Sequence, residues 1–186
     1  MKFAPVVVAF VLLSPATISA HEHSIPGGLS PQAGVEADVL PYVTGGWYAS
    51  GWVGYDRVRL RLVASKVNPP DFTLKDDFTN GETRAYAALV DYFPRPAFEG
   101  PWIGGGIEHW DNRVGHPAET ATGNYQNWMA TVGGGWVFGM GRHLYLNPWA
   151  AGHWRIAGDT QTYVGSRLFQ PRSALAEASV KMGWRF

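Results

Sequence analysis

The sequence of 186 residues contains no cysteine, so no disulfide bond can stabilise its fold. Charged residues make up only 16%, and 15 basic and 15 acidic side chains cancel to a net charge of zero. This balance gives no sign of the basic surface that nucleic-acid binding requires. Beyond residue 20, the chain lacks any apolar run long enough to cross a bilayer as a helix. A domain of this size without disulfides must rest on packing or on a closed hydrogen-bond network.

Residues 1–20 have the pattern of a secretory signal peptide. Lys2 supplies a charged start, residues 6–13 form an apolar core, and small residues lead to Ala20, after which we expect cleavage. A retained N-terminal helix is the alternative, but its apolar core is too short to span a membrane. Residues 21–33 then form a polar leader, and residues 34–186 form the folded domain.

After this cleavage the mature chain begins with the sequence HEHS. The free amine of His21, two backbone amides and the imidazole of His23 form a square-planar nitrogen set of the kind that suits Cu(II) or Ni(II). A polar leader without a metal is the simpler alternative. The metal hypothesis fails if mass spectrometry places the mature N-terminus anywhere but His21.

Glycine and aromatic residues are abundant: the chain has 23 glycines and nine tryptophans, and 14% of its residues are aromatic. Runs of about ten residues with alternating apolar and polar side chains recur, separated by turn-forming residues. A period of two is typical of a β-strand with two unlike faces. The sequence predicts an all-β fold with eight strands, at residues 34–42, 47–55, 58–66, 84–93, 101–110, 125–138, 144–156 and 173–186.

The connections between these runs alternate in length, except for the first. The short turns are 56–57, 94–100 and 139–143, and the long loops are 67–83, 111–124 and 157–172. Outer-membrane barrels are built in this way, with short turns in the periplasm and long loops outside. We therefore predict an eight-stranded antiparallel transmembrane β-barrel.

Charged side chains of both signs fall on one face of several predicted strands. In a membrane barrel this face lines the interior, where an unpaired charge is costly, so we expect the charges to pair. An eight-stranded barrel is just wide enough for side chains to fill it. The predicted interior charge network consists of Glu36, Asp38, Arg59, Arg61, Glu108, His153, Arg155, Glu177, Lys181 and Arg185.

Aromatic side chains gather near the ends of the predicted strands, with smaller apolar residues between them. A soluble core gives no reason for this placement, whereas the two interfaces of a membrane do. The predicted aromatic girdles consist of Trp47, Tyr55, Tyr92, Trp102, Trp110, Trp128, Trp136, Phe138, Trp154, Trp184 and Phe186.

With its signal peptide, eight strands, alternating loop lengths and C-terminal Phe186, the sequence resembles the small eight-stranded outer-membrane proteins of the OmpA/OmpX/OmpW-like group. The resemblance implies the outer membrane of a Gram-negative bacterium, with lipid and lipopolysaccharide around the barrel. It also implies that Phe186, Trp184 and Met182 form the signal read by the barrel-assembly machinery. It is architectural and points to no single member of the group.

An enzymatic function is not expected. The segment HWRIAG, which begins at His153, resembles the catalytic segment of the lipid A deacylases, a family with Ser two residues after the His. Here that position is Arg155, so the nucleophile beside the base is missing. Glu108 and His109 are neighbours on a strand and face opposite ways, so they cannot act as one acid–base pair.

We therefore predict an outer-membrane protein with a structural or surface-interaction role, in which a mostly plugged barrel presents its long loops. The loop segments DFTN and GNYQNW offer amides and aromatic rings to an extracellular protein or glycan. A porin-like channel for small solutes or hydrophobic compounds is one alternative. A secreted lipocalin-like binder, with Gly-Gly-Trp at 45–47, is the other and requires an apolar cavity and charges outside. No cofactor and no nucleic-acid partner is expected.

Overall fold

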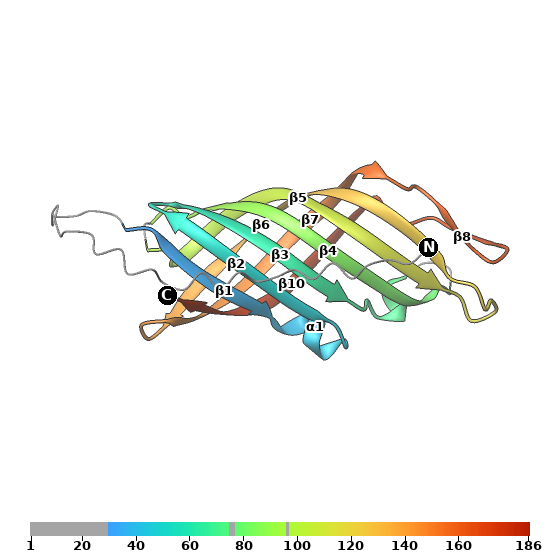
Figure 1. Cartoon of the computed structure of the whole chain (residues 1–186), viewed down its shortest axis with the longest axis horizontal. Coiled ribbons are helices and arrows are strands. Elements are labelled where there is room, and N and C mark those ends of the chain that lie inside the picture. Colours follow the sequence, from blue (N-terminus) through green and yellow to red (C-terminus); the bar gives the residue numbers. More distant parts are fainter. Residues whose placement is uncertain (1–29, 75–76, 96) are drawn as a thin grey trace, which may run out of the picture.

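The computed structural model describes residues 30–74, 77–95 and 97–186. Its eight long strands form one closed antiparallel barrel, in which the first strand pairs with the last (Figure 1). These strands are β1 (Gln32–Asp38), β2 (Trp47–Tyr55), β3 (Val58–Val67), β4 (Thr79–Tyr92), β5 (Gly100–Gly115), β6 (Gly123–Met140), β7 (Leu144–Gly158) and β10 (Ala174–Arg185). The predicted all-β, eight-stranded antiparallel barrel is confirmed.

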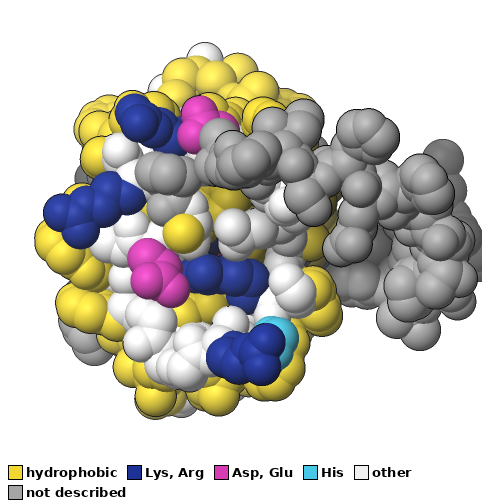
Figure 2. All heavy atoms as spheres, turned by 90° about the vertical axis from the view of Figure 1, so that its left-hand side faces the viewer, with side chains coloured by type: hydrophobic (Ala, Val, Ile, Leu, Met, Phe, Trp, Pro, Cys, Tyr) yellow, Lys and Arg dark blue, Asp and Glu magenta, His cyan; other side chains and the backbone are white. Residues whose placement is uncertain are grey.

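The outer wall of the barrel is apolar and the inner wall carries the charges. In β3, Leu60 and Leu62 are 45% and 59% exposed, whereas Arg59 and Arg61 are buried in the lumen. Figure 2, which views the end that carries the short turns, shows hydrophobic side chains around the rim and charged ones nearer its middle. This is the reverse of the arrangement that a soluble lipocalin-like barrel requires.

The first predicted strand, 34–42, is wrong in its second half. β1 ends at Asp38, and the chain continues as the short helix α1 (Val39–Val43). The carboxylate of Asp38 accepts a hydrogen bond from the Leu40 N–H, 3.1 Å away, and so caps the helix. Pro41 lacks the N–H that would continue a ladder. In the described part of the chain, no helix is both long enough and apolar enough to cross a membrane.

Four strands extend further than predicted at the end that carries the long loops. β4, β5, β6 and β7 contain 14, 16, 18 and 15 residues, whereas β1, β2 and β3 contain 7, 9 and 10. A transmembrane strand needs only about 9–11 residues. The predicted loops therefore shorten to 68–78 and 116–122, because ladder hydrogen bonds continue through polar sequence.

The last long loop, 159–173, contains a small hairpin of β8 (Thr162–Val164) and β9 (Arg167–Phe169). The loop 68–78 contains one turn of 3-10 helix, η1 (Asp71–Thr73). Regular structure thus continues into two of the three long loops.

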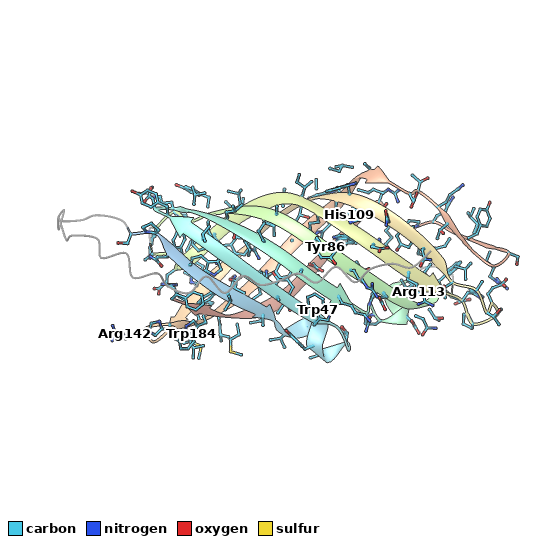
Figure 3. All side chains as sticks on the ribbon, viewed as in Figure 1. Trp47, Tyr86, His109, Arg113, Arg142 and Trp184 are labelled. Atoms are coloured by element: carbon cyan, nitrogen blue, oxygen red, sulfur yellow. The ribbon has the colours of Figure 1, made fainter. Side chains whose placement is uncertain are left out.

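Along the outer face of β5, apolar side chains give way to polar ones. Ile103 and Ile107 are 60% and 50% exposed, and the next outward positions are His109, Asp111 and Arg113. Figure 3 places His109 and Arg113 on the side of the barrel toward the long loops. Such a change from apolar to polar is expected where the outer wall of a membrane barrel leaves the lipid.

Candidate functional site

Four charged side chains form a buried ion network in the half of the lumen nearer the short turns. Arg59 lies 3.2 Å from Glu36 and 2.9 Å from Asp91. Arg61 lies 3.0 Å from Asp91 and 3.8 Å from Glu36. Alternation brings these residues of β1, β3 and β4 to the inner wall, where each charge has partners of opposite sign.

An apolar plug fills the lumen beside this network. The Trp52 N–H donates to the Tyr145 hydroxyl over 2.7 Å, and that hydroxyl donates to Glu36 over 3.0 Å. The guanidinium of Arg59 lies 5.0 Å from the centre of the Phe93 ring. The buried members of the plug are Trp52, Phe93, Phe98, Trp102, Val137 and Tyr145.

Glycines on the inner wall make room for the plug. A side chain at Gly54 would overlap the Phe98 ring, and one at Gly183 would overlap the Tyr145 ring. Large and small residues thus alternate around the lumen at this level, which closes the cross-section by packing.

A second polar cluster crosses the half of the lumen nearer the long loops. Thr131 donates to Glu108 over 2.8 Å, and the same hydroxyl lies 2.8 Å from Nδ1 of His153. The Trp110 N–H also donates to Glu108, over 2.6 Å. The other ring nitrogen of His153 lies 3.3 Å from Glu177. Because Thr131 donates to Glu108, it accepts from His153, which assigns a proton to Nδ1.

Between these two groups, Lys181 lies against aromatic rings. Its ammonium is 3.6 Å from the centre of the Trp149 ring and 5.6 Å from that of Tyr48. Asp38, the register partner of Lys181 across the β1–β10 seam, accepts instead from the Trp149 N–H (2.7 Å) and from Ser179. Lys181 is therefore held by a cation–π contact.

The structure brings together most of the predicted charge network but divides it by level. Within the described residues, Asp38 and Lys181 form no ion pair, contrary to the expected pairing, because Asp38 accepts from neutral donors and Lys181 lies against Trp149. Two further members lie outside the network. Arg155 donates to the backbone carbonyls of Asp159 and Pro171 at the long-loop end. Arg185 pairs with Glu99 (3.4 Å) at the short-turn end. Both lie near strand ends, where backbone carbonyls and turn residues are the nearest acceptors.

The girdle residues face outward, with two exceptions. Trp102 is buried in the plug, and Trp110 faces the lumen beside Glu108. Like Glu108, both stand at even-numbered positions of β5, and alternate residues of a strand face the same side. The exposed members are Trp47, Tyr55, Tyr92, Trp128, Trp136, Phe138, Trp154, Trp184 and Phe186.

The three residues expected to form the assembly signal lie on the outer wall. Met182, Trp184 and Phe186 are 52%, 43% and 74% exposed. Figure 3 shows Trp184 at the short-turn end, near Arg142. The signal peptide and the proposed metal ligands His21 and His23 lie outside the described residues. Within the described part of the chain, no group of three or more potential ligands could hold a metal ion.

The long loops pack against one another. Phe78, Val114, Val164 and Phe169 form a buried apolar cluster that joins the loops 68–78 and 159–173 to the end of β5. Glu119 accepts from the Ser166 hydroxyl over 2.8 Å and from the Ser166 N–H over 3.4 Å. These hydrogen bonds hold the pKa of Glu119 below its ordinary value.

Solved structures share this architecture. The N-terminal β-barrel domain of Pseudomonas aeruginosa OprF aligns over 86% of this chain and 100% of its own, with a TM-score of 0.56 and 15% identity. A major outer membrane protein from Thermus thermophilus aligns over 84% and 100%, with a TM-score of 0.55 and 10% identity. The fold is that of an outer-membrane barrel. No family model and no curated protein matches the sequence.

For this outer-membrane barrel, the predicted resemblance is confirmed at the level of the fold. The apolar outer wall and the girdles agree with the predicted location in the outer membrane of a Gram-negative bacterium.

Sequence reasoning missed several residues of the lumen in this outer-membrane barrel. Asp91 is the acid shared by both arginines, and Trp52, Phe98 and Tyr145 form much of the plug. The alternation along β4 indicated that Asp91 faces inward, because its neighbours Val90 and Tyr92 face outward. Phe98 lies within the short turn between β4 and β5, where alternation gives no direction.

Proposed function

We propose that this protein is a non-conducting outer-membrane barrel that presents a folded loop assembly at the cell surface. The observation that carries the proposal is the plug. The lumen of eight strands is narrow, and at the short-turn end it holds the rings of Trp52, Phe98 and Trp102 together with two arginine side chains. A solute would have to displace both packed rings and paired charges to pass.

The packing of the loops supports a surface role. Because apolar contacts and the Glu119–Ser166 hydrogen bonds tie the loops together, the assembly presents a fixed shape to a partner. On the β8–β9 hairpin, Tyr163 and Leu168 are register partners that remain 61% and 43% exposed. Exposed aromatic and apolar side chains on a rigid support suit contact with an extracellular protein or glycan.

Conductance in planar lipid bilayers tests whether the lumen is closed. We expect no single-channel steps from the wild-type protein. A variant with Trp52→Ala and Phe98→Ala should produce steps, because it removes two rings of the plug. Steps from the wild type that change with Arg59→Met or Arg61→Met would instead support the small-solute channel.

Cysteine labelling tests which end faces the outside, and because the sequence has no cysteine the wild-type chain itself is not labelled. Tyr163→Cys lies on the β8–β9 hairpin, and Arg142→Cys lies in the short turn between β6 and β7. On intact cells, a membrane-impermeant maleimide should label the first variant. It should label the second only after the outer membrane is permeabilised. The opposite pattern would contradict the proposal.

A further inference from the structure

A cavity of about 740 Å³ occupies the lumen between the plug and the long loops. Its floor includes Arg61, Trp102 and Lys181, and Leu74 and Phe169 lie near its mouth. Sites for small molecules are commonly clefts of about 300–1,000 Å³. This half of the lumen has the size of a binding site.

The wall of the cavity is largely apolar. Leu89, Met129 and Ala151 are buried inner-wall residues of three different strands, and the rings of Tyr48 and Trp149 stand beside them. These residues stand at the inward-facing positions of their strands, as the arginines and acids beside the plug do. Apolar residues on the inner wall of a membrane barrel contact no lipid, so they suit an apolar occupant.

Lys181 supplies a charged group at the floor of this cavity. Its side chain is 1% exposed and lies against the Trp149 ring. Within residues 30–74, 77–95 and 97–186, its ammonium has neither an ion pair within 4.0 Å nor a hydrogen bond. The carboxylate of Asp38 accepts from Trp149, Ser179 and Leu40 instead. The ammonium borders the cavity and can donate to an anionic group placed there.

The second polar cluster limits what kind of anion fits. Glu177 precedes Lys181 by four positions on β10, about 13 Å along the strand toward the mouth. With Glu108 it places two carboxylates around His153, which would repel a second negative charge on the ligand. A polyanion such as a sugar phosphate is therefore disfavoured. A molecule with one anionic group at Lys181 and an apolar body avoids this repulsion.

From this geometry, we propose that the cavity binds a monoanionic amphiphile, an alkyl carboxylate whose head lies at Lys181 and whose chain runs along Leu89 and Met129. The carboxylate head contacts the Lys181 ammonium, and the chain contacts the apolar wall. The plug lies beneath Lys181 and closes the cavity at that end. The ligand enters and leaves by the long-loop end.

Equilibrium dialysis of radiolabelled octanoate tests this site, using the full barrel in lipid nanodiscs and empty nanodiscs as the blank. We expect saturable binding of octanoate, and weaker binding of octyltrimethylammonium and octanol. Lys181→Met should weaken octanoate binding by about tenfold or more, since a hydrogen bond to a charged group is lost. Arg185→Met, which removes a cation at the short-turn end, is the matched control and should leave binding unchanged.

A second variant tests the cavity without altering Lys181. Leu89→Trp fills the space along the wall and should abolish binding, and heat-modifiable migration on gels confirms that each variant is folded. The proposal is overturned if the wild type does not bind octanoate, if octyltrimethylammonium binds as well, or if either folded variant binds normally.

Discussion

Arg59 is the side chain on which the closed half of the lumen depends most. It pairs with Glu36 and Asp91, and its guanidinium also lies over the rings of Trp52 and Phe93. Its own side chain is 1% exposed. Removing it would leave two carboxylates with only Arg61 between them, in a place that water does not reach freely.

We predict that Arg59→Met destabilises the folded barrel by about 3–5 kcal/mol, because removing one partner leaves buried charge uncompensated. The measurement is urea unfolding of protein folded into lipid vesicles, followed by tryptophan fluorescence. Arg57→Met, at an exposed turn two residues away, is the control and should shift the free energy of unfolding by less than about 0.5 kcal/mol. Equal stabilities for the two variants would contradict the central role of Arg59.

The positions of the two arginines in the lumen could be predicted, because the period of two in β3 leaves no other face for them. The identity of their partners could not be predicted. Alternation tells which side of the wall a residue faces, but it does not tell how far along the barrel axis the residue lies. The level depends on the register between strands, which for Asp91 is set by pairing with Arg59 across β3 and β4. Sequence alone therefore predicted the lining of the lumen but not its division into plug and cavity.

The last strand, β10, combines closure of the barrel with the expected assembly signal. The Phe186 N–H donates to the Ala33 carbonyl over 3.0 Å, while its ring is 74% exposed on the outer wall. The backbone bond does not depend on the side chain. Assembly and stability can thus be separated by a substitution at this position.

For Phe186→Ser, we predict a severalfold lower level of assembled protein in the outer membrane but a free energy of unfolding within about 0.5 kcal/mol of wild type. Quantitative blotting of membranes gives the first quantity, and unfolding of refolded protein gives the second. Phe138→Ser, an outward aromatic that is 51% exposed and lies outside β10, should assemble normally. Normal membrane levels for Phe186→Ser would count against the signal.

The β8–β9 hairpin is tied to the neighbouring loop through Glu119. Because the pKa of Glu119 is lowered in the folded state, its contribution is present above its ordinary pKa and is lost as the pH falls through the lowered value. We predict that hydrogen exchange at Ser166, corrected for intrinsic rate, accelerates as the pH falls from about 5 to 3. In Glu119→Gln, Ser166 should exchange faster at pH 5 and show little further change at lower pH. Identical pH profiles for this variant and the wild type would contradict the role of Glu119.

At the scale of the whole molecule, the closed barrel satisfies its ladder hydrogen bonds internally and turns apolar side chains outward. We predict that the protein remains in the membrane fraction through washes with urea and alkaline carbonate and is released only by detergent. Fractionation followed by blotting checks this. Release into aqueous buffer without detergent would contradict a membrane barrel.

The overall architecture was predictable because alternation, turn spacing and connection lengths all agree on one answer. The lengths of the strands were not predictable. Beyond Ile107 the outer face of β5 becomes polar, which resembles loop sequence, yet the ladder continues to Gly115. Backbone pairing persists there without any apolar face to reveal it.

The unequal strand lengths give the exposed part of the protein a slope. With 18 residues in β6 and 7 in β1, the wall at β5 and β6 extends further toward the long loops than the side at β1 and α1 does. The molecule thus has a tall side and a low side. A neighbour diffusing in the membrane plane meets an upright polar face from one direction only, so contacts with such a neighbour would be directional.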